Sequence, residues 1–86
     1  MIQESVTVRH PGGLEGRKVA LLVQMACQYE SRIYVIRDNK KVNAKSLLGM
    51  TSLVFSENSE ITISAEGEDE ELAIANIEKY LSNRGK

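Results

Sequence analysis

Two spacings of hydrophobic residues divide the 86-residue chain into strands and helices. Four segments carry the alternation, or the β-branched and aromatic residues, typical of strands: residues 2–9, 33–36, 40–44 and 61–65. Three others repeat apolar residues at helical spacing: residues 16–30, a short turn after Ser46, and a segment that begins at Asp69. The predicted order is therefore βαββαβα, an α+β arrangement with helices on one face of an antiparallel sheet.

The helix predicted over residues 16–30 has one apolar stripe and two flanks. The stripe consists of Val19, Leu22, Val23, Ala26 and Tyr29. Ala20 and Cys27 widen it, so we expect Cys27 to be a buried small hydrophobe. Leu21 and Met25 lie one turn apart and off the stripe, and we expect them at the surface.

Turn-forming residues separate the elements. Residues 10–13 (His-Pro-Gly-Gly) stop the first strand, because proline lacks a backbone donor and glycine permits turn geometry. Asp38 and Asn39 form the turn of a hairpin. The last helix starts among acidic residues 68–71, which the helix dipole favours there, and we expect residues 83–86 to close it with a glycine. Its expected inward-facing residues are Ala73, Ile74, Ile77, Tyr80 and Leu81.

Composition indicates one folded domain over residues 1–86. Hydrophobic residues make up 42% of the chain and charged residues 27%, which separates it from disordered sequences. Eleven basic and twelve acidic residues give a net charge of −1, which argues against electrostatic binding of nucleic acid. No apolar run approaches the roughly 18 residues of a membrane span, no signal peptide opens the chain, and the single cysteine fits a reducing compartment. We therefore expect a cytoplasmic protein that binds neither nucleic acid nor a membrane.

Ser46 stands just before Leu47, Leu48 and Met50, where a hydroxyl residue caps a helix. A helix N-terminus leaves backbone N–H groups free and carries a partial positive charge, so it would accommodate a phosphate on this serine. The three apolar side chains are more than such a short helix can bury. From the residues alone, two interpretations stay open: a serine switch beside a docking surface, or an ordinary cap followed by core residues.

No other group of residues predicts catalysis or a cofactor. His10 is the only histidine, and we expect it at a solvent-facing strand end. One histidine and one cysteine are too few for the usual zinc site or for a nucleophile–histidine pair. We read the carboxylates of residues 68–71 as a solvated helix start. We therefore expect no enzyme activity, no metal and no cofactor.

Three stretches of this sequence resemble the HPr family, the small phosphocarrier proteins of the bacterial sugar phosphotransferase system. They are residues 42–53, beginning Val-Asn-Ala-Lys-Ser, Gly13-Leu14 with Arg17 upstream, and residues 61–70, ending Glu-Gly-Glu-Asp-Glu. The resemblance spans essentially the whole chain. It implies an HPr-like open-faced β-sandwich, in which three helices cover one face of a four-stranded antiparallel sheet.

The chain departs from the family at the position that carries the transferred phosphoryl group. In the phosphocarriers a histidine follows the Gly-Leu pair, whereas this chain has Glu15 there and Lys18 in place of a proline. A carboxylate is a weak nucleophile whose acyl phosphate would need its own activating site. We therefore expect no histidine phosphotransfer. Whether Glu15 is only a first-turn acid beside Arg17 or has a function of its own stays open.

The resemblance implies a regulatory role through Ser46, as in HPr paralogues that lack the active histidine but keep this serine. In Gram-positive members the HPr kinase/phosphorylase phosphorylates the matching serine, and the product binds catabolite control protein A as a corepressor. On this hypothesis Arg17 helps to position the phosphate. Leu47, Leu48 and Met50 form the apolar part of the docking patch, which Thr51, in place of the usual methionine, makes smaller.

Two alternatives remain from the sequence. One is a phosphocarrier that uses another acceptor such as His10, and the other is a paralogue that binds some other protein without any phosphorylation. The resemblance also bears on the oligomeric state, because paralogues of this kind can exchange their first strand between protomers. Residues 11–13 lie where such a hinge would be, so the expected state is a monomer or a strand-swapped homodimer, with a slight preference for the monomer.

Overall fold

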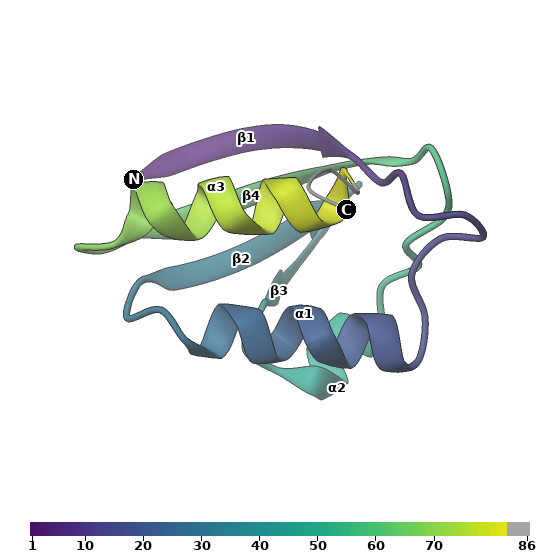
Figure 1. Ribbon diagram of the computed structural model, residues 1–86, viewed down its shortest axis with the longest axis horizontal. Coiled ribbons are helices and arrows are strands. Elements are labelled where there is room, and N and C mark those ends of the chain that lie inside the picture. Colours follow the sequence, from purple (N-terminus) through teal and green to yellow (C-terminus); the bar gives the residue numbers. More distant parts are fainter. Residues whose placement is uncertain (83–86) are drawn as a thin grey trace.

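The computed structural model describes residues 1–82 and confirms the predicted order of elements (Figure 1). The strands are β1 (Ile2–Thr7), β2 (Arg32–Arg37), β3 (Lys40–Asn43) and β4 (Glu60–Glu66). The helices are α1 (Arg17–Cys27), α2 (Leu47–Thr51) and α3 (Glu70–Leu81). The expected glycine closure at residues 83–86 lies outside the described residues.

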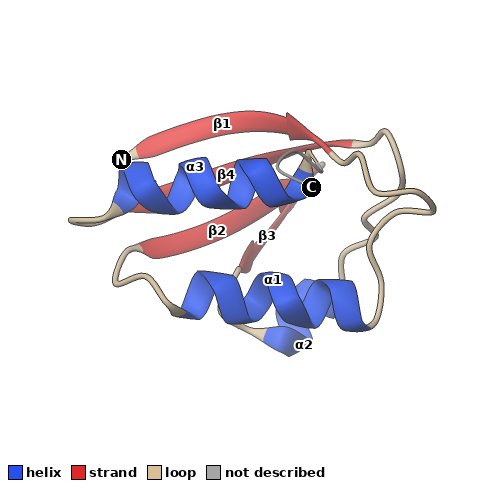
Figure 2. Cartoon of the chain, viewed as in Figure 1, coloured by secondary structure: helices blue, strands red, loops and turns tan. Residues whose placement is uncertain are grey.

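The four strands form one antiparallel sheet in the order β1-β4-β2-β3. The register runs from Ile2 opposite Ala65 to Thr7 opposite Glu60 between the first and last strands. Alternate residues of β2 and β4 are buried on one face, as period-two patterning requires; they are Ile33, Val35, Ile61, Ile63 and Ala65. Figure 2 shows α1 and α3 on the same side of the sheet, and α2 packs against α1 and β3.

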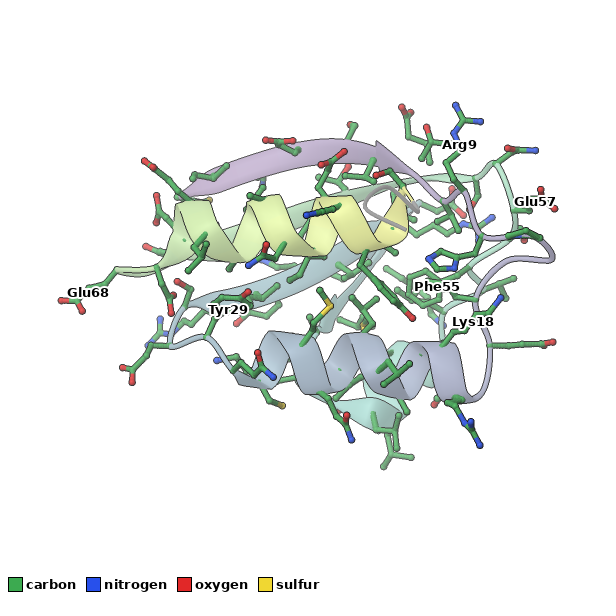
Figure 3. The ribbon with its side chains drawn as sticks, viewed as in Figure 1. Arg9, Lys18, Tyr29, Phe55, Glu57 and Glu68 are labelled. Carbon is green, nitrogen blue, oxygen red and sulfur yellow. The ribbon has the colours of Figure 1, made fainter. Side chains whose placement is uncertain are left out.

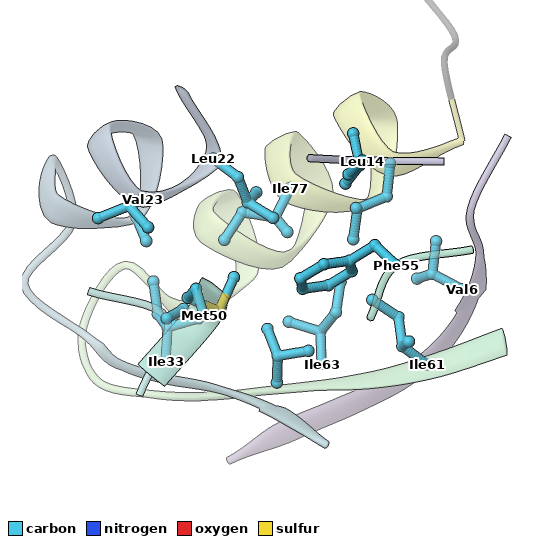
Figure 4. Packing of buried hydrophobic residues seen from close by; sticks show 14 of the residues in the cluster. Val6, Leu14, Leu22, Val23, Ile33, Met50, Phe55, Ile61, Ile63 and Ile77 are labelled. Atoms are coloured by element: carbon cyan, nitrogen blue, oxygen red, sulfur yellow. The ribbon is translucent and has the colours of Figure 1, made fainter. Parts of the chain in front are cut away.

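The core lies between this face of the sheet and the helices. Phe55, from the segment between α2 and β4, is 2% exposed and lies near Ile61, Ile63 and Leu14 (Figure 4). It belongs to one continuous cluster of buried hydrophobic residues that joins every helix to the sheet. The loop before α1 and the segment after α2 are therefore attached to the same core.

Two expectations about the flanks of α1 are wrong. Successive residues of a helix are turned by about 100°, which places Met25 and Cys27 at similar angles on opposite sides of the buried stripe. Met25 is half-buried and packs against the core, because α3 lies on its flank. Cys27, the last residue of the helix, is exposed, and its Sγ makes only a long contact of 3.8 Å with the carbonyl of Lys45. Leu21 is exposed, as expected.

The expectation for His10 is also wrong, because the C-terminal end of α3 covers it. His10 is 9% exposed, its Nε2 lies 2.7 Å from the carbonyl oxygen of Tyr80, and the two rings are 4.9 Å apart. The backbone N–H of Arg9 donates to the carbonyl of Leu81 at 2.9 Å. The segment after β1 thus supplies donors to carbonyls that the end of a helix leaves without partners.

Candidate functional site

Ser46 is the N-cap of α2, as predicted. Its backbone is extended (φ −107°, ψ 114°), and its Oγ accepts a hydrogen bond of 3.2 Å from the backbone N–H of Gly49. Because Oγ is the acceptor, this bond leaves the hydroxyl hydrogen free to point outward. Asn43 fixes the approach to the cap, since its side chain accepts from Lys45 N at 2.8 Å and its carbonyl accepts from Ser46 N at 3.0 Å.

Lys45 directly precedes the cap, but its side chain extends away from Ser46. Its Nζ donates to the carbonyl oxygen of Tyr29 at 2.6 Å, just beyond the C-terminal end of α1. A cation is favourable there because the helix dipole is negative at that end. Lys45 in this position therefore supplies no positive charge to Ser46, and a phosphate there would need a cation from elsewhere in the chain or from a partner. Sequence reasoning missed this role, because nothing local to Lys45 indicates where its side chain goes.

Arg17 is the first residue of α1, and α1 packs against α2. Its side chain is exposed and makes no ion pair or hydrogen bond with any residue of the described part of the chain. No hydrogen bond joins it to Ser46 within residues 1–82. Among residues 1–82, Arg17 is thus an unpaired cation at the start of α1, whereas Ser46 lies near the other end of that helix, where Lys45 contacts Cys27 and Tyr29.

The apolar patch beside Ser46 differs from the predicted one. Leu47 is 50% exposed and Leu48 is 85% exposed, so both are at the surface as expected. Met50 is 0% exposed, and its prediction as a docking residue is wrong. The face of α2 that packs on α1 and β3 carries Met50, whose flexible side chain fills the core there. Val54, which is 66% exposed, is an apolar surface residue that the sequence analysis did not select.

Glu15 lies in a cleft at one end of the molecule. The cleft has a volume of about 280 Å³ and is lined by Gly12, Leu14, Glu15, Thr51, Leu53, Val54, Phe55 and Ser56. Figure 3 shows Lys18, Phe55 and Glu57 at this same end. The cleft brings Glu15 next to Thr51, so two of the three positions at which the chain departs from the family pattern share one surface.

The loop before α1 is fastened tightly to the segment after α2. Leu14 N donates to the carbonyl of Phe55 at 2.8 Å, and Gly12 N donates to the Glu57 side chain at 3.0 Å. Gly13 has φ +81°, and a Cβ there would lie 2.1 Å from the carbonyl oxygen of Phe55, so only glycine fits. The backbone around Glu15 is therefore held in place by tertiary contacts.

Glu15 is exposed and precedes the N-cap of α1, which is Gly16. No acidic residue lies in the first turn of that helix, so the interpretation of Glu15 as a first-turn acid is wrong. Its carboxylate makes no ion pair or hydrogen bond within residues 1–82. Lys18 is in the first turn of α1, and its carbonyl accepts a hydrogen bond of 2.9 Å from the Tyr80 hydroxyl, whose pKa burial raises.

His10 is placed poorly for accepting a phosphoryl group. Its Nε2 must be the protonated nitrogen, because the carbonyl of Tyr80 that it contacts can only accept. The lone pair of the neutral ring is then on Nδ1, and the residue that carries it is only 9% exposed. Within the described residues, no group of three or more histidine, cysteine, aspartate or glutamate side chains could hold a metal ion. Across residues 1–82, no helix is both long enough and apolar enough to cross a membrane.

The comparison with protein families decides the classification. A family model described as the PTS HPr component phosphorylation site matches residues 2–83. The chain belongs to the HPr family. HPr proteins and the related Crh proteins are phosphocarrier or regulatory proteins rather than catalysts, and an HPr-family role of one of these kinds applies to this chain.

Relatives of both kinds are similar to this member of the HPr family. The HPr-like protein Crh of Bacillus subtilis is 43% identical over 81 residues, which cover 94% of this chain and 95% of that protein. The crystal structure of the phosphocarrier protein HPr from Bacillus anthracis is 40% identical, covers 93% of this chain and 95% of its own, and has a TM-score of 0.90. The crystal structure of Bacillus subtilis Crh, described as a swapped, intertwined dimer, is 41% identical, covers 100% and 99%, and has a TM-score of 0.80.

Proposed function

We propose that this chain is a regulatory HPr protein of carbon catabolite repression, switched by phosphorylation of Ser46. The HPr kinase/phosphorylase adds the phosphate, and the product binds catabolite control protein A as a corepressor. The observation that carries the proposal is the geometry of Ser46, a helix cap whose hydroxyl lies beside the exposed side chains of Leu47 and Leu48. Similarity to Crh of Bacillus subtilis, which is described as a catabolite repression protein, supports the same role.

A phosphate on Ser46 would have a favourable environment at the start of α2. Free N–H groups and the positive end of the helix dipole face an anion at that position. The phosphate adds about −1.5 to −2 charges and can form one to three charge-assisted hydrogen bonds with arginine or lysine. Lys45 is engaged at Tyr29 and Arg17 lies at the opposite end of α1, so on this proposal the partner supplies most of the positive charge.

The same proposal holds that the chain does not transfer phosphoryl groups through a histidine. Glu15 occupies the acceptor position, and its exposed carboxylate has no activating partner among residues 1–82. The alternative of His10 as an acceptor is opposed by the burial of this residue, which is 9% exposed and hydrogen-bonded through Nε2 to the carbonyl of Tyr80. Incubation with enzyme I and phosphoenolpyruvate should leave the chain unlabelled, and acid-labile label on His10 would favour the phosphocarrier alternative.

The Ser46 proposal is tested with the kinase, ATP and the purified regulator. The wild-type chain should become labelled, Ser46→Ala should not, and Ser52→Ala should behave as wild type because it removes a hydroxyl from the opposite end of α2. The phosphorylated chain should bind the regulator about 5–150-fold more tightly than the unmodified chain, the usual range of such couplings. Equal binding of the two forms would contradict the switch and favour a paralogue that acts without phosphorylation.

The contribution of the apolar patch is tested in the same titration. Leu48→Ala should weaken binding of the phosphorylated chain, because Leu48 is 85% exposed and its loss does not disturb the core. Leu72→Ala is the matched control, since Leu72 is 58% exposed on α3, away from Ser46. If both variants bind as wild type, the patch is not part of the interface.

We also propose that the chain is a monomer in solution, with exchange of β1 as the alternative state. The fastening of the loop before α1 to Phe55 and Glu57 supports the monomer. The swapped dimer described for Crh of Bacillus subtilis, together with the glycines of the loop, supports the alternative. Sedimentation equilibrium over a range of concentrations distinguishes the two.

A further inference from the structure

A second cleft lies between the β2–β3 hairpin and the segment that follows α2. Its volume is about 270 Å³, and it is lined by Arg37, Asp38, Lys40, Ser52, Leu53 and Val54. None of its polar residues belongs to the surface around Ser46 described above. It needs its own explanation, because two of its residues are cations.

Arg37 is held in this cleft by the register of the sheet. It is the last residue of β2 and follows Ile33 and Val35 on the face that points to the core. Its Nη1 is buried and has no hydrogen-bond partner in the structure. An arginine is always charged, and a buried donor without an acceptor is unfavourable, so the guanidinium lacks a counter-group.

Lys40 adds a second positive charge at the same place. It lies directly opposite Arg37 in the hairpin, an arrangement in which like charges repel. Its Nζ donates to the backbone carbonyl of Ser52 at 3.4 Å, which holds the ammonium over the cleft without neutralising it. Asp38, in the turn between them, forms no ion pair with either cation, since the ion pair found within residues 1–82 joins the N-terminus to Glu70.

We propose that this cleft binds a small phosphate-bearing anion. An arginine fork beside a lysine ammonium is the combination that suits a doubly charged tetrahedral oxyanion. Leu53 and Val54 supply an apolar wall, and the cleft has room for the carbon part of a short phosphate monoester as well as for the phosphate itself. The bound anion neutralises the repulsion between Arg37 and Lys40, so binding also stabilises the fold. This site is independent of Ser46 and of its modification.

The test uses the full, unmodified chain labelled with ¹⁵N. Inorganic phosphate and glycerol 3-phosphate are titrated in separate arms at constant ionic strength, with chloride as the reference salt. Saturable shifts are expected at the Arg37 side-chain N–H and at backbone amides of residues 38–40 and 52–54. Tighter binding of the ester identifies an organic phosphate as the ligand, and equal binding identifies the free ion.

Variants distinguish specific binding in this cleft from nonspecific attraction of anions to positive charges on the surface. Arg37→Gln and, separately, Lys40→Met should each weaken binding by about tenfold or more, the scale of a lost charge-assisted hydrogen bond. Lys41→Met is the matched control with the same loss of charge, because Lys41 lies over the Tyr34 ring outside this cleft, and it should bind as wild type. Phosphate should raise the thermal unfolding midpoint of the wild-type chain above that in chloride. The proposal is overturned if no saturable shifts occur, or if all three variants lose binding equally. If Arg37→Gln does not fold, the comparison of Lys40→Met with Lys41→Met decides the result.

Discussion

Neighbouring residues of this chain have opposite roles around Ser46. Lys45 carries its charge to the end of α1, Ser46 caps α2, and Leu48 stands in solvent, while Met50 fills the core. A five-residue helix is too short to be stable alone, so its position depends on the cap and on Met50. The surface side chains next to Ser46 can therefore be varied without loss of the fold, whereas Met50 cannot.

Ser46→Ala should lower the free energy of unfolding by about 0.5–2 kcal/mol, because the N–H of Gly49 loses its acceptor. Ser46→Asp should retain most of the stability, since a carboxylate can also cap a helix. Urea unfolding at fixed pH measures both. Ser52→Ala, an exposed serine at the other end of α2, should change stability by less than the Ser46→Ala variant. Equal losses would mean that the cap contributes nothing of its own.

The region around Glu15 is held together by the segments that connect the helices and strands. The loop before α1, the segment after α2 and the C-terminal end of α3 meet at one end of the molecule. Leu14 pairs with Phe55, His10 contacts Tyr80, and Arg9 donates to Asn58 at 3.1 Å. Glu15 therefore occupies a rigid position although it lies in a loop.

Gly13→Ala should destabilise the monomer by about 1–3 kcal/mol, the scale of local backbone strain. The added Cβ would meet the carbonyl oxygen of Phe55 at 2.1 Å in a left-handed conformation, so the loop must move away from the segment after α2. Gly12→Ala is the matched control, with a similar φ of +77° but nothing within 4 Å of the new Cβ. Thermal unfolding should show the larger loss for Gly13→Ala, and sedimentation should show whether the loosened loop favours exchange of β1. Equal losses would rule out the close contact as the cause.

The molecule as a whole is tied together by contacts between residues distant in the sequence. Asp69, the cap residue of α3, does not cap its own helix with its side chain. Its carboxylate instead accepts hydrogen bonds from the Ser31 hydroxyl, from Ser31 N at 3.0 Å and from Glu30 N at 2.9 Å. Gly67 packs against the same serine, because a Cβ there would lie 2.6 Å from Ser31 Oγ. The start of α3 is thus attached to the connection between α1 and β2.

Asp69 should make stability depend on pH in the acidic range. The hydrogen bond from the Ser31 hydroxyl, and then that from Glu30 N–H, lowers the pKa of Asp69 below its ordinary value of 3.8. As the pH falls, the carboxyl group of Asp69 is therefore protonated in the unfolded chain before it is protonated in the folded chain. The stabilisation is fully present at pH values above the ordinary pKa. It is lost as the pH falls below about 5 and then through the lower pKa of the folded chain. The pKa of Glu70 is lowered too, chiefly by Gly67 N–H, and acts in the same direction.

Urea unfolding of Asp69→Asn should therefore show a weaker loss of stability between neutral and acidic pH than the wild type. Glu71→Gln is the control, since Glu71 is exposed in the first turn of α3 and accepts no hydrogen bond from residues 1–82. Its pH dependence should match that of the wild type. The same slope in Asp69→Asn and wild type would show that the contacts of Asp69 do not control acid stability.

The sequence alone determined the element order, the Ser46 cap and the presence of Glu15. Each of these depends on residues a few positions apart, through the fixed periods of strands and helices or through a bond to a residue three positions along. The resemblance to the HPr family, carried by residues 42–53 and 61–70, added the family assignment that the comparison then confirmed.

Only the tertiary structure decided the environments of His10, Met25 and Arg37. Tyr80 lies 70 positions from the histidine that it covers, and the flank of α1 that buries Met25 is set by α3. The burial of the unpaired guanidinium of Arg37 depends on how the segment after α2 packs on the β2–β3 hairpin. Local periodicity fixes which way a side chain points, whereas burial and pairing depend on what distant parts of the chain place in front of it.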